Sequence, residues 1–121
     1  MAVVLVLEDN ADLREMYEEI LAIGGHSVLL SETASDARAV LASERPSVML
    51  LDLGIEGGAE GLVAEMRANP DLAGIAVILA SGARDLEEWA VALSADGFLQ
   101  KPFTHEQLIE AVRKVTSHTG A

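Results

Sequence analysis

The chain has no cysteine, few basic residues and no long apolar run. Without cysteine, neither a disulfide framework nor thiolate catalysis is available. Eight Lys and Arg residues face 20 Asp and Glu residues, and the formal net charge of −12 would repel nucleic-acid phosphates and anionic lipid surfaces. No apolar run approaches the length that spans a membrane. We therefore expect a cytoplasmic protein that contacts neither nucleic acid nor a membrane directly.

Short apolar runs alternate with helical patterns along the chain. The 121 residues, half of them hydrophobic, suffice for one domain, which we place at 1–116 with a short polar tail at 117–121. Five runs are predicted to be strands: Val3–Leu7, Val28–Leu30, Val48–Leu51, Ile75–Leu79 and Gly97–Leu99. Their continuous hydrophobicity is typical of parallel strands with helices on both faces. Right-handed crossovers then predict a doubly wound α/β sheet whose ligands bind beyond the carboxyl ends of the strands.

Helical periodicity and capping residues mark the segments between the strands. Apolar side chains recur at three- and four-residue spacing in two stripes: Leu13, Met16, Tyr17, Ile20 and Leu21, and then Leu108, Ile109, Val112 and Val115. Asn10 and Thr33 are good N-cap residues, and Thr104–Gln107 has the spacing of a capping box. Gly24-Gly25 and Pro70 indicate turns.

Chemically active side chains follow four of the predicted strands: Glu8-Asp9, Asp52, Ser81 and Lys101-Pro102. Because parallel strands share one carboxyl edge, these side chains could converge on one site. An acidic cluster needs a cation, and a lone aspartate beside it can act as a nucleophile toward phosphorus. Hydroxyl and ammonium groups can hold the phosphoryl oxygens. The pattern predicts a phospho-acceptor site.

Each of these motifs alone also has an ordinary structural explanation. An acidic pair after a strand is often a solvated loop or a helix N-terminus. Asp52 and Ser81 could be turn residues, and Lys101 could be a solvated charge where a strand stops at proline. If all of these ordinary explanations held, acidic, hydroxyl and cationic residues would occur at four strand ends by chance.

With these residues the chain resembles the receiver domain of bacterial two-component response regulators, in the manner of the chemotaxis regulators. The resemblance covers essentially the whole chain. Four segments in the expected order carry it: Val6–Asn10, Leu50–Leu53, Ile78–Gly82 and Gly97–Phe103. The resemblance implies a flavodoxin-like fold with the strand order 2-1-3-4-5.

The resemblance also implies a role for each site residue. Asp52 would accept a phosphoryl group from the histidine of a sensor kinase or a phosphotransfer protein, as a phospho-acceptor domain rather than an enzyme. Glu8, Asp9, Asp52 and the backbone carbonyl of Gly54 would hold Mg²⁺, which Mn²⁺ could replace. Lys101 would pair with Asp52 at rest and with the phosphoryl group after transfer.

Ser81 and Phe98 would couple this site to a partner surface. The Ser81 hydroxyl would move toward the phosphoryl group, and the Phe98 ring could rotate into the vacated space; otherwise Phe98 is an ordinary core residue. The surface of the fourth helix, fifth strand and fifth helix would then change and bind a downstream protein or effector domain. The same surface could form a homodimer. Trp89 is expected in the core, and if exposed it would be an interface anchor.

The chain departs from the family pattern at several positions. The loop 53–61 has Glu56 where relatives commonly have proline, and an apparent extra residue, so its path and the start of the third helix stay open. Gly54 and Ala83 lack the side chains with which relatives often shield the phosphoryl group or orient water. Ser94 stands where a left-handed glycine commonly ends the fourth helix. Three separated histidines are expected to have structural rather than metal-binding roles: His26, His105 and His118.

Three other functions stay open. A metal-dependent hydrolase with an aspartyl-phosphate intermediate typically has a second aspartate two residues after the nucleophile, where this chain has Gly54. A flavodoxin-like nucleotide or flavin module would need a phosphate-binding loop after the first strand, where Glu8-Asp9 would repel phosphate. A constitutive protein-binding module would keep the fold without depending on phosphorylation. Whether the chain is a complete single-domain regulator or an excised receiver also stays open.

Overall fold

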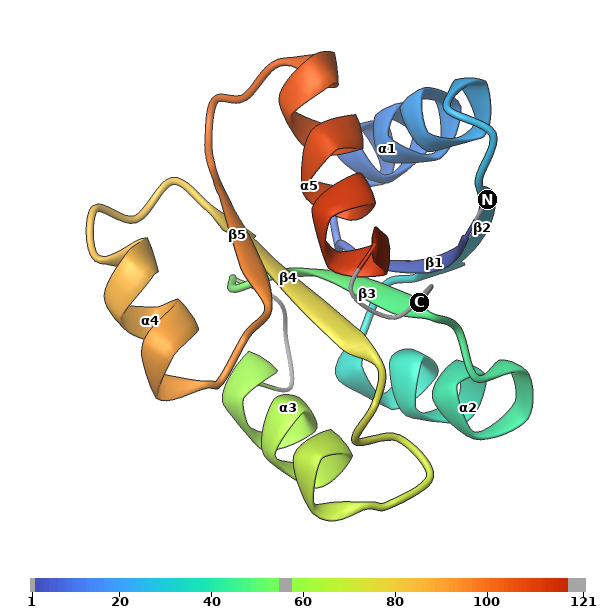
Figure 1. Cartoon of the computed structure of the whole chain (residues 1–121), viewed down its shortest axis with the longest axis vertical. Coiled ribbons are helices and arrows are strands. Elements are labelled where there is room, and N and C mark those ends of the chain that lie inside the picture. The colour runs from blue at the N-terminus through green and yellow to red at the C-terminus, as the bar shows by residue number, and fades with distance from the viewer. Residues whose placement is uncertain (1, 55–57, 118–121) are drawn as a thin grey trace.

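A parallel sheet forms the centre of the molecule in the computed structural model, which describes residues 2–54 and 58–117 (Figure 1). Its strands are β1 (Val3–Leu7), β2 (Ser27–Ser31), β3 (Val48–Asp52), β4 (Ala76–Ser81) and β5 (Gly97–Gln100). They pair in parallel in the order β2-β1-β3-β4-β5. The predicted fold class and strand order are confirmed.

Helices cover both faces of the sheet. They are α1 (Ala11–Ile23), α2 (Ala34–Glu44), α3 (Ala59–Ala68), α4 (Leu86–Ala92) and α5 (His105–Ser117). Figure 1 shows α1 and α5 on one face, with α2, α3 and α4 on the other. Ser117, the first residue of the predicted tail, belongs to α5, and 118–121 lie outside the described residues.

The sheet divides the core into two layers. Alternate strand side chains point to opposite faces, so Val4 and Val6 of β1 pack in the layer of α1 and α5. Leu5 and Leu7 pack in the layer of α2, α3 and α4. The inner strands are hydrophobic without alternation because a helix layer buries each of their faces.

Predicted caps start the helices at the carboxyl edge of the sheet. The Asn10 side chain accepts a hydrogen bond from the Leu13 N–H at 3.0 Å, and Thr33 accepts one from the Asp36 N–H at 3.1 Å. Thr104 and Gln107 form the predicted capping box, with reciprocal bonds of 2.7 and 3.0 Å. Each cap contributes about 1 kcal/mol to stability. The caps therefore fix the chain directly after β1, β2 and β5.

Two other backbone expectations concern loops. Ser94 has a φ of 55°, so this serine occupies the left-handed position that the sequence indicated. α3 begins at Ala59 after Gly58, whose φ of 84° suits glycine. The sequence did not predict the path of the loop after Asp52, and residues 55–57 of this loop lie outside the described residues.

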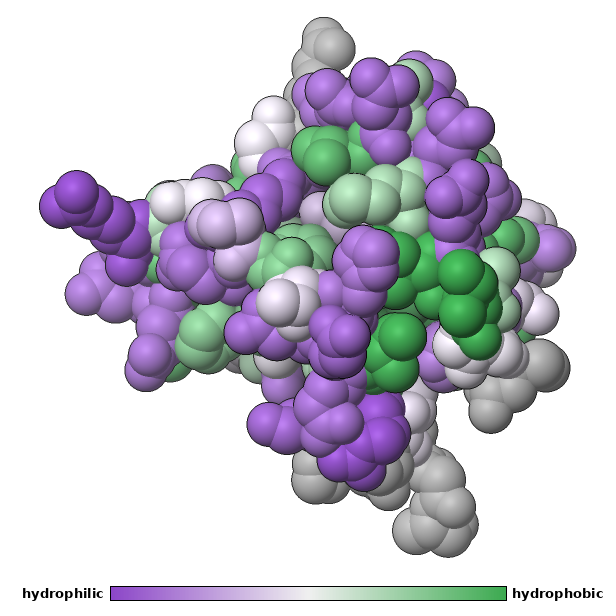
Figure 2. Space-filling model, turned by 90° about the horizontal axis from the view of Figure 1, so that it is seen from above, coloured by the Kyte–Doolittle hydropathy of each residue, from purple (hydrophilic) through white to green (hydrophobic). Residues whose placement is uncertain are grey.

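The face of the molecule seen in Figure 2 is largely hydrophilic. Figure 2 looks down on the molecule from the side of α1 and α5 and shows hydrophilic residues over most of this view, with apolar atoms between them. Large apolar side chains are exposed at Ile23, Leu30, Val91 and Phe98. No helix in 2–54 or 58–117 combines the length and hydropathy needed to cross a membrane.

Candidate functional site

The sheet brings the predicted site residues to one edge. Asp52 and Ser81 are the last residues of β3 and β4, while Glu8 and Lys101 directly follow β1 and β5. Parallel pairing of β1 with β3, β3 with β4 and β4 with β5 places these strand ends side by side. The predicted convergence of these four residues at the carboxyl edge is therefore observed.

Strand alternation separates the four side chains into two sets. Glu8, Asp52 and Lys101 each lie two residues after a side chain in the core layer of α1 and α5, namely Val6, Leu50 and Leu99. Ser81 lies one residue after Ala80 of that layer, so its side chain starts from the opposite face of the sheet. The carboxylates and the ammonium group therefore share one face.

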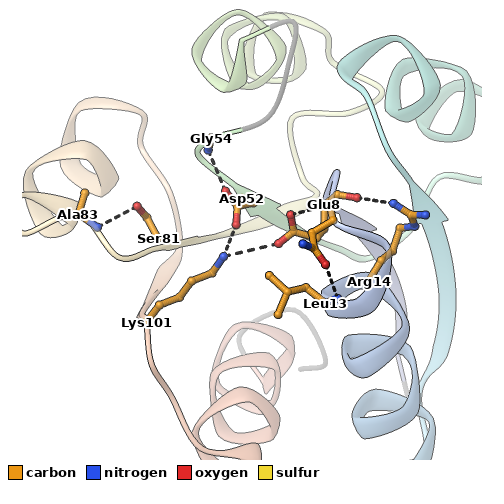
Figure 3. A network of polar contacts seen from close by, with 9 residues as sticks. Glu8, Leu13, Arg14, Asp52, Gly54, Ser81, Ala83 and Lys101 are labelled. Carbon is orange, nitrogen blue, oxygen red and sulfur yellow. Dashed lines mark hydrogen bonds and ion pairs between the residues drawn. The ribbon is translucent and has the colours of Figure 1, made fainter.

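Lys101 connects the two carboxylates. Its Nζ donates a short hydrogen bond to Asp52 Oδ2 and lies 3.5 Å from Glu8 Oε1. Figure 3 shows the lysine side chain reaching across from the end of β5 to both acidic groups. One cation thus faces two anions that are separated by 44 positions in the sequence. Removing the cation would leave two adjacent carboxylates with mutual repulsion.

Asp52 is held in its ionised form. Burial alone would raise its pKa, but hydrogen bonds from Lys101 and from the Gly54 N–H outweigh burial and hold the pKa below its ordinary value. The Gly54 N–H donates to Asp52 Oδ1 at 2.8 Å. Both carboxylate oxygens are therefore oriented, and an ionised carboxylate needs no general base to act as a nucleophile.

Glu8 lies deeper than Asp52, with only 2% of its surface exposed. Its Oε2 accepts the Asn10 N–H at 3.2 Å, and Arg14 Nη1 donates to its backbone carbonyl at 2.9 Å. Burial, more than the nearby Asp52, raises the pKa of Glu8 to about 7. Near neutral pH a proton therefore resides on Glu8 in part of the molecules, and it offsets the negative charge that Lys101 leaves uncompensated.

The donor set suits a hard divalent cation in its chemistry, since it offers carboxylate and carbonyl oxygens. Glu8 Oε1 is buried, and no hydrogen-bond partner reaches it within the described residues. Among those same residues, no three Asp, Glu, His or Cys side chains are already gathered into a metal site. Asp9 is exposed, and Lys101 lies between Glu8 and Asp52. The ligands would have to close around an ion as Lys101 moves aside.

Most of the chain matches one known protein family. Residues 4–113 match the family described as "Response regulator receiver domain". The chain belongs to the response regulator receiver domains. The resemblance predicted from the four strand ends is confirmed.

Curated relatives of this receiver domain are longer proteins. The phosphate regulon transcriptional regulatory protein PhoB of Pseudomonas aeruginosa is 28% identical over 120 residues, which are 97% of this chain and 52% of PhoB. The response regulator MprA of Mycolicibacterium vanbaalenii is 29% identical over 118 residues, which are 96% of this chain and 51% of MprA. The chain thus spans about half the length of these relatives.

Solved structures share the fold closely. NtrX of Brucella abortus superimposes with a TM-score of 0.89 and 25% identity over 98% of this chain and 28% of that one. The chemotaxis response regulator CheY4 of Vibrio cholerae gives a TM-score of 0.88 over 95% of this chain and 98% of that one. Its identity of 23% supports likeness in fold alone.

In this receiver domain the Ser81 hydroxyl is turned away from Asp52. Its Oγ accepts the Ala83 N–H at 3.0 Å, as Figure 3 shows. Gln100 holds the same loop, since its Nε2 donates to the Ser81 carbonyl at 3.3 Å and to the Ala83 carbonyl at 2.9 Å. The loop between β4 and α4 is thus fastened to β5, with the hydroxyl outside hydrogen-bonding contact with Asp52.

The aromatic residues near this loop occupy surface and boundary positions. Phe98 is 42% exposed, so the alternative of an ordinary core phenylalanine is wrong. It lines a groove of about 660 Å³ between β5 and α5, together with Phe103, Ala111 and Val115. Trp89 is half-buried against the layer of α2, α3 and α4, which partly agrees with its predicted core position.

Two of the three histidines lie within the described residues. His26 is half-buried and its Nδ1 accepts the Ala2 N–H at 3.1 Å, while His105 is exposed at the start of α5. His118 lies outside the described residues.

Sequence reasoning missed three residues near the site. Arg14 lies between the stripe residues Leu13 and Met16 and was assigned no role, and Gln100 was part of a motif without a role of its own. Tyr17 was identified only as an apolar stripe position. Helical periodicity shows which side of a helix faces the core, but it says nothing about the polar atom at the end of a buried side chain. No pattern of residues alone would have found these contacts.

Proposed function

We propose that Asp52 accepts a phosphoryl group from a phosphohistidine of a sensor kinase or phosphotransfer protein. In this step an Asp52 oxygen forms a bond to phosphorus, the bond from phosphorus to the histidine nitrogen breaks, and its electron pair returns to the imidazole. The observation that carries the proposal is the Lys101 ammonium held between Asp52 and Glu8. Phosphoryl transfer depends mainly on positioning and charge neutralisation, and Lys101 is placed to supply both.

The proposed cation ligands are Glu8, Asp9, Asp52 and the Gly54 carbonyl. The carboxylates suit Mg²⁺, and Mn²⁺ has similar ligand preferences. When bound, the cation would neutralise charge on the phosphoryl oxygens. The protein's own contribution is to hold Asp52 through the Gly54 N–H, and to keep Lys101 close enough to follow the new charge.

Phosphorylation would then change the surface of α4, β5 and α5. A phosphoryl group offers the Ser81 hydroxyl a charged acceptor, and such a hydrogen bond contributes about 1.5–3 kcal/mol. This gain would compete with the contacts that now hold the loop, from Ala83 and Gln100. The exposed Phe98 ring could then turn inward, so the groove between β5 and α5 would differ between the two states.

The partners follow from this scheme. A histidine kinase or phosphotransfer protein would bind next to Asp52, and a downstream protein or effector domain would bind the α4, β5 and α5 surface. The same surface could pair two copies of the chain. PhoB and MprA are named as a transcriptional regulatory protein and a response regulator, which supports a role in signalling.

Intact-mass measurement tests the phospho-acceptor role. Wild type incubated with acetyl phosphate and Mg²⁺ should gain one phosphoryl group, whereas Asp52→Asn should gain none. Asp12→Asn, which alters an exposed carboxylate of α1, is the matched control and should behave as wild type. Phosphate gain by Asp52→Asn, or none by wild type, would refute the assignment.

A second measurement tests the switch. Beryllofluoride with Mg²⁺ stands in for the phosphoryl group, and it should move the amide chemical shifts of residues 84–113. Ser81→Ala should bind beryllofluoride but show a smaller change. Binding without any change in these shifts would favour a constitutive binding module instead.

A further inference from the structure

Tyr17 places a hydroxyl group in the interior next to the proposed phospho-acceptor site. Only 1% of the residue is exposed, and its hydroxyl makes no hydrogen bond within the described residues. Burying a hydroxyl without a partner is unfavourable, so most buried hydroxyls are satisfied by protein or ordered water. A phenylalanine would fill the same space without this penalty. The hydroxyl therefore needs an explanation.

The position of the ring is well defined. Tyr17 lies on α1 and packs in the same core layer as the side chains beneath Asp52 and Lys101. Its ring stacks on Phe103, with the ring centroids 5.9 Å apart and the planes at 10°. Phe103 follows Lys101 by two residues, so the stack joins α1 to the segment that carries the lysine.

The charged groups of the site lie near the Tyr17 hydroxyl. Burial raises the pKa of Tyr17 to about 12; Lys101 opposes this through its charge and a side-chain contact, while the charges of Glu8 and Asp52 raise the pKa further. The phenol is therefore protonated at neutral pH and can donate one hydrogen bond.

A matching acceptor lies in the same region. Glu8 Oε1 is the other buried side-chain atom without a hydrogen-bond partner in the described part of the chain. Its nearest cation is the Lys101 Nζ at 3.5 Å, which already donates to Asp52. Both atoms thus lie near the same lysine. If Lys101 follows a phosphoryl group, its contact with Glu8 Oε1 is lost, and this oxygen can accept a hydrogen bond.

We propose that Tyr17 is a positioning residue for the phosphorylated state: when Lys101 turns to the phosphoryl group on Asp52, the Tyr17 hydroxyl donates to Glu8 Oε1. This inference rests on the proposed phospho-acceptor function. The hydroxyl stabilises the carboxylate that the lysine leaves, and it does so only after Lys101 has moved. The unfavourable unpaired hydroxyl of the resting state is relieved in the phosphorylated state.

Tyr17→Phe tests the proposal because it removes the hydroxyl and keeps the stack on Phe103. The variant should fold at least as stably as wild type, since the resting hydroxyl has no partner to lose. Its maximal rate of phosphorylation by acetyl phosphate should fall about tenfold, with the half-saturating acetyl phosphate concentration unchanged. Ile20→Val, a small change on the same buried face of α1, is the control and should keep the wild-type rate.

Thermal unfolding gives a readout that does not depend on turnover. Beryllofluoride with Mg²⁺ should raise the melting temperature of wild type and of Ile20→Val equally, and that of Tyr17→Phe by clearly less. Equal rises in all three proteins, together with equal phosphorylation rates, would overturn the role of Tyr17. Failure of wild type itself to take up phosphate would instead overturn the proposed function.

The chain's single tyrosine allows a direct observation in wild type. Protein labelled with 3-fluorotyrosine should give one fluorine resonance, and beryllofluoride with Mg²⁺ should shift it. The same addition should leave the resonance of labelled Asp52→Asn in place. An unshifted resonance in wild type that has bound beryllofluoride would show that Tyr17 does not respond to the site.

Discussion

Replacing Glu8 with glutamine should change how stability depends on pH. Burial raises the folded-state pKa of Glu8 to about 7 from an ordinary value of 4.5. The folded protein therefore binds a proton between these pH values that the unfolded chain has released, and its stability falls as pH rises through this window. At about 1.4 kcal/mol for each pH unit, a shift of this size corresponds to a few kcal/mol of stability. Glu8→Gln keeps the shape of the side chain and removes its titration.

The assay is urea unfolding at pH 5 and pH 8 in the presence of EDTA, so that no divalent cation contributes. Wild type should lose stability between the two pH values relative to Glu8→Gln, and the difference between the proteins should be on the order of 2 kcal/mol. Burial lowers the pKa of His26, which acts in the opposite direction, but this contribution is common to both proteins and cancels. Parallel pH profiles for wild type and Glu8→Gln would refute the burial argument.

Three other perturbations test the site and its supports. Mg²⁺ should raise the melting temperature of wild type, and Asp9→Ala should lose most of that rise; equal rises would exclude Asp9 as a ligand. Gln100→Ala should speed amide hydrogen exchange in the loop after Ser81, because its two bonds to carbonyls are lost, and unchanged exchange would contradict this role. Arg67→Ala should lower the urea-unfolding free energy by about 2 kcal/mol, since Arg67 donates hydrogen bonds to three backbone carbonyls and to Asp96. Arg38→Ala removes only an exposed ion pair with Glu65 and should change this free energy far less.

The strands and the site edge could be predicted because their signals are local. Strands buried on both faces appear as unbroken apolar runs, and Asp52 and Ser81 fall where two of these runs end. N-caps such as Asn10 and Thr33 accept a hydrogen bond from the backbone N–H three residues later. A capping residue at the start of a helical pattern is therefore visible in the sequence. The strand order came from the family resemblance, because periodicity alone does not say which strands are neighbours.

The remaining features depend on contacts between distant residues. The Ser81 hydroxyl accepts a hydrogen bond from the Ala83 N–H rather than contacting Asp52, and the sequence does not show the rotamer that makes this contact. The high pKa of Glu8 arises from burial under the completed fold, which an acidic pair in a sequence does not reveal. Phe98 was expected to be a switch residue, and the structure places it outward in an exposed position, but its rotation stays a prediction.

The most direct test of the central claim is to locate the phosphoryl group itself. Wild type treated with acetyl phosphate and Mg²⁺ would be reduced with borohydride, which converts a phosphoaspartate to homoserine, and the position would be found by tandem mass spectrometry. We predict homoserine at position 52 and nowhere else in the chain, with none formed when Mg²⁺ is removed by EDTA. Homoserine at another aspartate, or an unmodified Asp52 in protein that has gained phosphate, would contradict the account.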